Sequence, residues 1–404
     1  MFSGLIINEF IKLFAKKKTY IILLLFVALS GIFVAVNESA ENSYLKYNSP
    51  KYRLDNVNSQ IAYQKSYMEE VNADNTYSKE EKDRMISDSQ EYLKSLELEK
   101  ANVEKEVADY SPDNWRERAG NQIEEYNSYL KGATDEESKT YYQKEIDRIQ
   151  IHLDKNIPLD DAYMNTGINY YLRNITLVAA GFLAFGLILF SGDSVSNEYN
   201  PATLKFLLIQ PVSRIKVLLS KYFVMLISSL GLIMLTQFLF FLGVSLFKGI
   251  GNFARPMLVD TKYEFITQNG NKVLSEITGS GHYIDLSSYL VRALLLQGLY
   301  IIVMVSFIFM VSTLVKSGIV SLTINISALL GANIIYNLST TYRKFSPFIF
   351  IHYSDIESII SGNIVSRSNN LLFTYQTIII VSIITALVCI GVALAVFKKR
   401  DIQI

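Results

Sequence analysis

The sequence predicts an all-α membrane protein, and three observations carry this prediction. Half of the 404 residues are apolar and only 19% are charged, below the roughly 25% of an average soluble domain. Apolar runs close to the about 20 residues that a helix needs to cross a bilayer recur along the chain. Between the first two runs lies a long polar segment, 37–169, without any such run. A polytopic membrane protein with a large polar insert follows.

Six apolar runs are the candidate membrane spans. They cover residues 19–36, 170–190, 222–247, 289–315, 318–336 and 373–397. The second and fourth carry Arg173 and Arg292 near their starts, where a long side chain can reach the lipid headgroups. The fifth is polar for a span because it contains Thr323, Asn325 and Asn333. Such a composition is typical of a helix that packs inside a bundle or lines a pathway.

The distribution of Lys and Arg predicts the orientation. The ends and the loops after the second and fourth runs contain 12 basic and 4 acidic side chains. We therefore expect both termini to be cytoplasmic. The insert and the loops 248–288 and 337–372 then lie on the outer side of the membrane. The chain divides into an N-terminal interfacial helix and first span (1–36), an extracytoplasmic domain (37–169) and the remaining spans (170–404).

The insert reads as helices and not as a linker. It holds 28 acidic and 17 basic side chains, and apolar residues recur in it at heptad-like spacing. Capping boxes at Ser78–Glu81 and Thr134–Glu137 mark helix starts. We expect three or four antiparallel helices that form an elongated, coiled-coil-like bundle. A spacer without a ligand site and a ligand-binding domain both remain open for it.

Two outer loops have patterns of their own. Tyr263–Thr267 and Lys272–Ile277 flank Asn269–Gly270, which is a strong short-range signal for a β-hairpin. The apolar segment 345–362 is interrupted by Pro347 and a polar run. It is too short to span twice, so we expect a re-entrant or interfacial helix pair there.

The chain has no visible catalytic chemistry of its own. It lacks a GxxxxGK[ST] phosphate-binding loop, so nucleotide hydrolysis in this chain is excluded. Three isolated histidines and the single Cys389 give no metal-binding or nucleophile motif. We therefore expect no enzyme activity, no metal and no cofactor in this chain. Its formal net charge of zero points to no nucleic-acid partner.

Two cytoplasmic segments suggest a docking surface. Leu5–Lys18 is amphipathic, with Lys12 and Lys16 beside Glu9 on its polar face, and is typical of an interfacial helix. Its apolar face is predicted to contain Phe2, Leu5, Ile6, Phe10, Leu13 and Phe14. The loop 191–221 holds an apolar stretch, Leu204–Ile209, that we expect to be buried against a partner. The simpler alternatives are topogenic anchoring for the helix and a membrane-surface connector for the loop.

Taken together, these segments resemble the ABC-2-type permease subunits of bacterial ATP-binding-cassette transporters. The N-terminal helix matches E-x-x-K-L-x-x-x-K/R from Glu9 to Lys16. The loop matches E-x-x-x-G-T-L-x-x-L-L-x-x-P-x-S-R from Glu198 to Arg214, and Lys221–Tyr222 follows it. Phe397–Asp401 matches a terminal F-x-x-R-D, and the segment 345–362 is similar to the family's re-entrant segment. Ala202 stands where the family commonly has Gly, so we expect the local turn to differ.

The resemblance implies a permease in the bacterial cytoplasmic membrane, worked by a separate ATPase subunit that binds ATP and Mg²⁺. Two ATPase copies would pair with two permease chains, as a homodimer or a heterodimer, in membrane lipid. The implied ATPase-docking residues are Glu198, Thr203, Leu204, Phe206, Leu207, Leu208, Pro211, Ser213 and Arg214. Glu9, Lys12 and Lys16 belong to the interfacial helix, and Thr323, Asn325 and Asn333 would line the pathway. The implied activity is export of an amphiphilic drug, antimicrobial peptide or lipid.

Other functional classes explain less of the sequence. A membrane receptor or scaffold would use the acidic bundle to bind a ligand or an envelope partner. A receptor needs a signalling domain or partner, and the longest cytoplasmic segment has only about 30 residues. An ion-coupled carrier is expected to show inverted repeats and buried carboxylates in its spans. The sequence shows neither.

Overall fold

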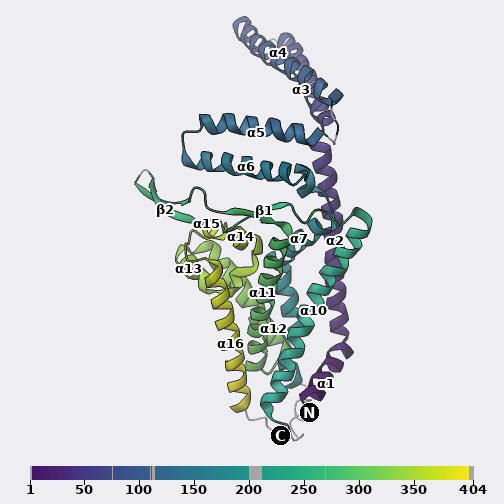
Figure 1. Cartoon of the computed structure of the whole chain (residues 1–404), viewed down its shortest axis with the longest axis vertical. Helices are drawn as coiled ribbons and strands as arrows, with labels where there is room; N and C mark the ends of the chain where they lie inside the picture. The colour runs from purple at the N-terminus through teal and green to yellow at the C-terminus, as the bar shows by residue number, and fades with distance from the viewer. Residues whose placement is uncertain are drawn as a thin grey trace.

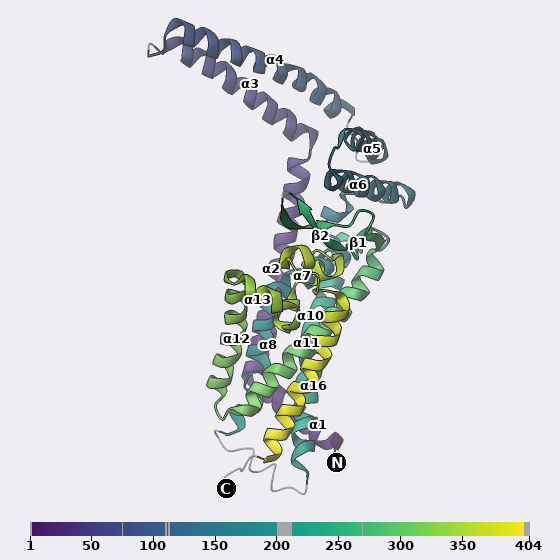
Figure 2. The ribbon, with the colours of Figure 1, turned by 90° about the vertical axis from the view of Figure 1, so that its left-hand side faces the viewer.

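The computed structural model describes residues 2–74, 76–109, 111, 114–199, 212–268 and 270–399. The described chain is mostly helical and is elongated (Figure 1). The long apolar helices form one half of the molecule. The helices of segment 37–169 form the other end, with short strands between the two halves (Figures 1 and 2). Helix α1 (Phe2–Ala15) and the end of α16 (Tyr375–Lys399) lie together at the far end of the long helices.

Five described helices are long and apolar enough to cross a membrane. They are α2 (Lys17–Tyr47), α10 (Arg214–Lys248), α11 (Leu286–Leu314), α12 (Gly318–Leu338) and α16. Helix α11 is the core of this half, because 61% of its apolar window is buried against 17–28% in the other four. The remaining apolar surface of those four is available to lipid or to another chain.

The run predicted as the second span is broken into three pieces. Helix α7 (Gly167–Leu177) passes through a π-helical turn, η3 (Val178–Phe182), into α8 (Leu183–Ser191). The backbone of Gly181 leaves the helical region, with φ 176° and ψ −41°. The apolar sequence gives no sign of this break, since π-turns depend on tertiary packing rather than on hydropathy. A sixth span therefore requires these three pieces to cross together.

The insert forms two helical hairpins and not the single bundle that its sequence predicts. Helix α2 first runs past residue 36 to Tyr47, beyond the expected domain boundary. Helices α3 (Pro50–Ala73) and α4 (Lys79–Asp109) then pack on each other, as do α5 (Trp115–Gly132) and α6 (Glu136–Asp154). The two pairs point in different directions (Figure 2). Each pair has a thin core: Val57, Val71, Leu96 and Val103 in one, and Trp115, Ala119 and Ile149 in the other.

One predicted capping box is confirmed and the other is displaced by a residue. Ser78 and Glu81 exchange hydrogen bonds at the start of α4, with Ser78 N donating to Glu81 Oε2 at 2.9 Å. At the start of α6 the cap is Asp135, not Thr134, because Asp135 Oδ1 accepts from Ser138 N at 2.7 Å. Asp and Thr both cap helices, so composition alone does not choose between neighbours.

The all-α prediction is corrected by four short strands. The predicted hairpin is present as β2 (Tyr263–Gln268) paired antiparallel with β3 (Asn271–Glu276). A second pair, β1 (Pro256–Val259) with β4 (His282–Asp285), encloses it. That pair has four residues a strand and no tight turn, so the sequence carries little signal for it.

Short helical turns connect α12 to α16. They are the 3₁₀ turns and helices α13 (Thr340–Phe345), η5 (Ser346–Phe348), η6 (Phe350–Ser354), α14 (Ile356–Ser361) and α15 (Ile364–Ser368). Two further 3₁₀ turns, η2 (Leu159–Tyr163) and η4 (Ser196–Tyr199), flank the broken helix. The backbone of residues 260–261 donates to the carbonyls of Ile360 and Ser361, which attaches α14 to the strands.

We predict that Gly362→Ala destabilises the protein. Gly362 has φ +88°, and a Cβ there would lie 2.1 Å from the carbonyl oxygen of Thr261. A non-glycine residue in this region costs about 1–3 kcal/mol. Thermal unfolding in detergent should therefore show a lower Tm. Gly391→Ala is the matched control, because that helical glycine has open space around it. Equal Tm values for the two variants would contradict the prediction.

Candidate functional site

A buried ion-pair cluster lies at the end of the molecule that contains α1. Lys221, on α10, has only 2% of its side chain exposed. Its Nζ lies 2.8 Å from Glu9 Oε2 of α1 and 2.5 Å from Glu198 Oε1 of η4. Lys12 Nζ approaches the other oxygen of Glu9 at 3.3 Å. We call Glu9, Lys12, Glu198 and Lys221 the Lys221 cluster.

The Lys221 cluster joins three segments that are far apart in the sequence. An ammonium group cannot be buried without partners, because the lost hydration costs several kcal/mol. Two carboxylates supply those partners here, and Lys12 balances the second negative charge. Because each charge in the cluster is compensated by a charge from another segment, the cluster determines how α1 and η4 pack on the first turns of α10.

The segment 191–199, which leads into the predicted docking loop, is attached to several helices. Asp193 accepts from Lys18 Nζ of α2 at 2.6 Å. Ser312 Oγ of α11 accepts from the backbone N–H groups of Val195 and Ser196, both at 3.1 Å. Ser321 of α12 donates to the carbonyl of Gly192. The segment thus contacts the core helix directly, and any displacement of it must be transmitted to these helices.

The predicted docking residues fall into two groups. The structure describes Glu198, Ser213 and Arg214. Glu198 belongs to the Lys221 cluster. Ser213 caps α10 by accepting a hydrogen bond from Lys216 N at 3.4 Å, and Arg214, which is half-buried, is the first residue of that helix. Thr203, Leu204, Phe206, Leu207, Leu208 and Pro211 lie outside the described residues, as does the terminal pair 400–401. The role of this loop as a docking surface stays a prediction.

The buried side of α1 is mostly its predicted apolar face: Leu5 and Leu13 are buried and Phe2, Ile6 and Phe10 are half-buried, whereas Phe14 is exposed. Glu9, predicted on the polar face, is buried as well. Leu5, Glu9 and Leu13 form its buried face, which packs on α10. Ile7, Ile11 and Phe14 form an exposed apolar stripe on another face, with Phe14 51% exposed. Glu9 is buried because Lys221 meets it there. Lys16 is exposed.

The three predicted pathway residues do not share one buried face of α12. Asn325 is buried and donates to the carbonyl of Ser321 at 2.8 Å. Thr323 and Asn333 are exposed, and each donates to the carbonyl four residues earlier. Their lining of a transport pathway stays a prediction.

Sequence reasoning missed Lys221, Lys18, Asp193 and Ser312 as parts of one arrangement. A signal existed for Lys221: it is the one charged residue in the run 217–247 of an otherwise apolar helix. A lone charge in such a run predicts a buried partner of opposite sign. No comparable sequence pattern indicates the contacts of Ser312 and Asp193.

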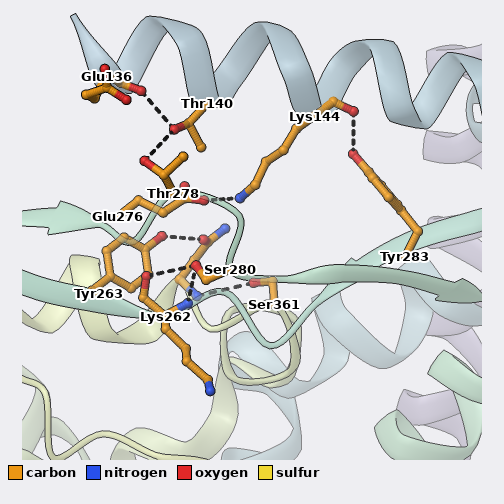
Figure 3. A network of polar contacts seen from close by, with 11 residues as sticks. Glu136, Thr140, Lys144, Lys262, Tyr263, Glu276, Thr278, Ser280, Tyr283 and Ser361 are labelled. Atoms are coloured by element: carbon orange, nitrogen blue, oxygen red, sulfur yellow. Dashed lines mark hydrogen bonds and ion pairs between the residues drawn. The ribbon is translucent and has the colours of Figure 1, made fainter.

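A second polar network connects α6 to the strands at the other end of the molecule (Figure 3). Lys144 forms an ion pair with Glu276 of β3, and its carbonyl accepts from Tyr283 Oη at 3.0 Å. Thr140 Oγ1 donates to Thr278 Oγ1 at 3.2 Å. Tyr263 Oη of β2 donates to Asn363 at 2.8 Å. The insert is therefore attached through the strands to the segment that follows α14.

Comparison with known proteins identifies the family. The model of the ABC-2 family transporter proteins matches residues 4–402, which is nearly the whole chain. This chain belongs to the ABC-2 transporter family. An uncharacterized protein of Bacillus subtilis (strain 168), YhcI, is 23% identical over 292 residues, covering 72% of this chain and 86% of that protein. No solved structure matches the chain.

Family membership gives the coarse function. The chain is the membrane component of an ABC transporter, and this family associates with an ABC ATPase subunit. The match and the apolar helices together make it a multi-pass membrane protein. The chain itself contributes no nucleotide-binding loop, because its sequence lacks that motif.

We predict that Lys221→Met destabilises the transporter because it leaves Glu9 and Glu198 facing each other without their shared cation. Removing one partner of a buried ion pair costs about 3–5 kcal/mol. The variant should show a markedly lower Tm and a smaller monodisperse fraction in size-exclusion chromatography.

The triple variant Glu9→Gln, Glu198→Gln, Lys221→Met removes all three of these charges and should recover much of the loss. A single Lys221→Met variant with the wild-type Tm would show that the cluster contributes nothing to stability.

Proposed function

We propose that this transporter is the permease subunit of an exporter in the bacterial cytoplasmic membrane. A separate ATPase subunit, in two copies with ATP and Mg²⁺, would drive it. Its cargo would be amphiphilic: a drug, an antimicrobial peptide or a lipid-like molecule. The observation that supports the proposal most directly is the attachment of segment 191–199 to the Lys221 cluster and to Ser312 of the core helix.

This attachment suits a subunit that receives mechanical work. An ATPase bound at the loop 200–211 would displace η4, since η4 immediately precedes that loop. The Lys221 cluster would carry the displacement to α1 and α10, and Ser312 would carry it to α11. Coupling between distant sites requires a packed element with two arrangements. We propose that α1, η4 and the start of α10, which the Lys221 cluster joins, move together as this element.

The arrangement of the spans fits a paired permease. In this proposal α7, η3 and α8 cross as the sixth span, and two chains assemble around a shared pathway. Helix α12 is the least buried of the five long apolar helices, and Ile319 and Leu338 on it are 78% and 81% exposed. That surface can contact lipid or the second chain. Asn325, Thr323 and Asn333 would then lie near the pathway between the chains.

The first test addresses ATPase docking. We expect that Leu207→Asp combined with Arg214→Glu abolishes co-purification of a Walker-motif ATPase with the tagged chain, while the chain stays in the membrane. A buried apolar contact that receives a charge loses its driving force for association. The measurement is mass spectrometry of the complex after gentle purification, with the ATP turnover of the eluate.

The matched control for this test is Leu98→Asp with Arg116→Glu, which changes the same residue types on exposed positions of α4 and α5. It should retain the ATPase. If the wild-type chain carries no ATPase even after crosslinking, the exporter proposal fails. The receptor or scaffold alternative would then be favoured.

The second test addresses orientation. We predict that Lys100→Cys reacts with a membrane-impermeant thiol reagent added to intact cells and that Lys205→Cys reacts only after the membrane is opened. The native Cys389 is buried in α16 and should stay unlabelled. The reverse pattern would place the insert in the cytoplasm, contrary to the excess of basic residues at the opposite end of the spans.

A further inference from the structure

A cavity lies where the insert and strands meet the long helices. It has a volume of about 440 Å³ and is lined by residues of α6, α7, β1, α11 and α14. Three arginines line it: Arg148 of α6, Arg173 of α7 and Arg255, which precedes β1. One carboxylate, Glu357, also lines it and is exposed.

Arg255 is a buried cation without a full set of partners. It is only 5% exposed, and its Nε makes no hydrogen bond within the described structure. The nearest carboxylate oxygen, Asp161 Oδ2, lies 3.8 Å from Nε, which is within ion-pair distance but beyond hydrogen-bond distance. Burial lowers the pKa of Arg255 and raises the pKa of Asp161, so both groups are poorly solvated. A buried guanidinium in this state needs an additional acceptor.

Arg173 adds a second cation to the same cavity. Its Nη2 donates to the carbonyl of Ala162 at 2.7 Å, and Nη1 contacts Asn37 Oδ1 at 3.5 Å. Within the described residues no carboxylate lies in ion-pair distance of Arg173. Arg148, in contrast, is held by Glu145 through both Nε and Nη2. Arg173 and Arg255 are therefore the arginines with capacity for a ligand.

The rest of the cavity lining combines apolar side chains with the polar side chains of His152, Asn169 and Thr176. Leu172, Leu177, Met257 and Tyr289 contribute to its wall. Leu177 is 40% exposed, and Phe185 and Leu189, on α8 beyond the break at 178–182, are 37% and 39% exposed. We call these exposed apolar side chains the stripe. Two cations beside an exposed apolar stripe match a molecule with an acidic headgroup and an apolar chain.

We propose that this cavity binds the phosphate headgroup of an anionic amphiphile, with Arg173 and Arg255 donating to its oxygens and the apolar chain lying on the stripe from Leu177 to Leu189. Arginine is suited to this role because its planar fork donates two parallel hydrogen bonds to phosphate. The inference goes beyond the proposed function, since the cavity binds such a headgroup whether the molecule is cargo or a resident lipid.

The test uses the full chain, purified in a neutral detergent, and dihexanoyl phosphatidate as the probe. Isothermal titration at pH 7.5 and constant ionic strength should show saturable binding. Dihexanoyl phosphatidylcholine has the same chains but a compensated headgroup charge, and inorganic phosphate has no chains. Each should bind at least about tenfold more weakly, which corresponds to about 1.4 kcal/mol.

Variants make the assignment specific. Arg173→Gln should weaken phosphatidate binding by about tenfold or more, the size expected for loss of a charge-assisted hydrogen bond. Glu357→Gln should strengthen binding, because it removes the carboxylate that lines the cavity. This gain separates the proposal from a general loss of structure and does not depend on the more buried Arg255. Arg116→Gln, an exposed arginine on α5 outside the cavity, should leave the affinity unchanged.

Three outcomes would overturn the proposal. The first is the absence of saturable phosphatidate binding. The second is an unchanged affinity in both Arg173→Gln and Glu357→Gln. The third is equal affinity for inorganic phosphate and phosphatidate, which would show that the apolar stripe takes no part. None of these outcomes affects ATPase co-purification, so this proposal and the proposed function fail independently.

Discussion

The burial of one ammonium group determines the arrangement of the helices around it. Lys221 is inside the protein, and its charge is tolerated only because Glu9 and Glu198 reach it from two other segments. The buried face of α1 therefore includes a carboxylate, Glu9, between Leu5 and Leu13. The segment 191–199, which precedes the predicted docking loop, lies against the same part of α10. This requirement brings together three segments separated by up to 212 residues.

The two ends of the molecule are connected through α11. At one end Ser312 of α11 holds the backbone of Val195 and Ser196. At the other end α11 contacts β1, β4 and α14, and the strands contact α6 through Lys144 and Thr140 (Figure 3). Because α11 is the most buried of the long apolar helices described, it cannot shift without repacking its neighbours. That property suits an element that connects the predicted docking loop to the insert.

Periodic features were predictable from the sequence, and features that depend on partners were not. The β2–β3 hairpin and the Ser78–Glu81 capping box follow from local rules, and both are present. The break at 178–182, the β1–β4 pair and the two separate hairpins of the insert arise from tertiary packing, which hydropathy does not encode. The same difference applies to the site: Glu9 and Glu198 were recognisable by their motif positions, but their shared contact with Lys221 depends on the fold. The apolar residues of the loop 200–211 remain known from sequence alone.

Among the described residues, the buried cations Lys221 and Arg255 differ in how fully each is paired, and this difference separates a structural role from a binding role. The ammonium of Lys221 has two carboxylates within 2.8 Å, so nothing more is needed to keep it buried. Arg255 has a nearest carboxylate oxygen at 3.8 Å and an Nε without an acceptor, and Arg173 beside it relies on a carbonyl and an amide. Folding alone gains little from leaving such donors unfilled. The cost of keeping these donors in a cavity is offset when a ligand oxygen occupies it, which is the physical reason for assigning an anionic headgroup to this cavity.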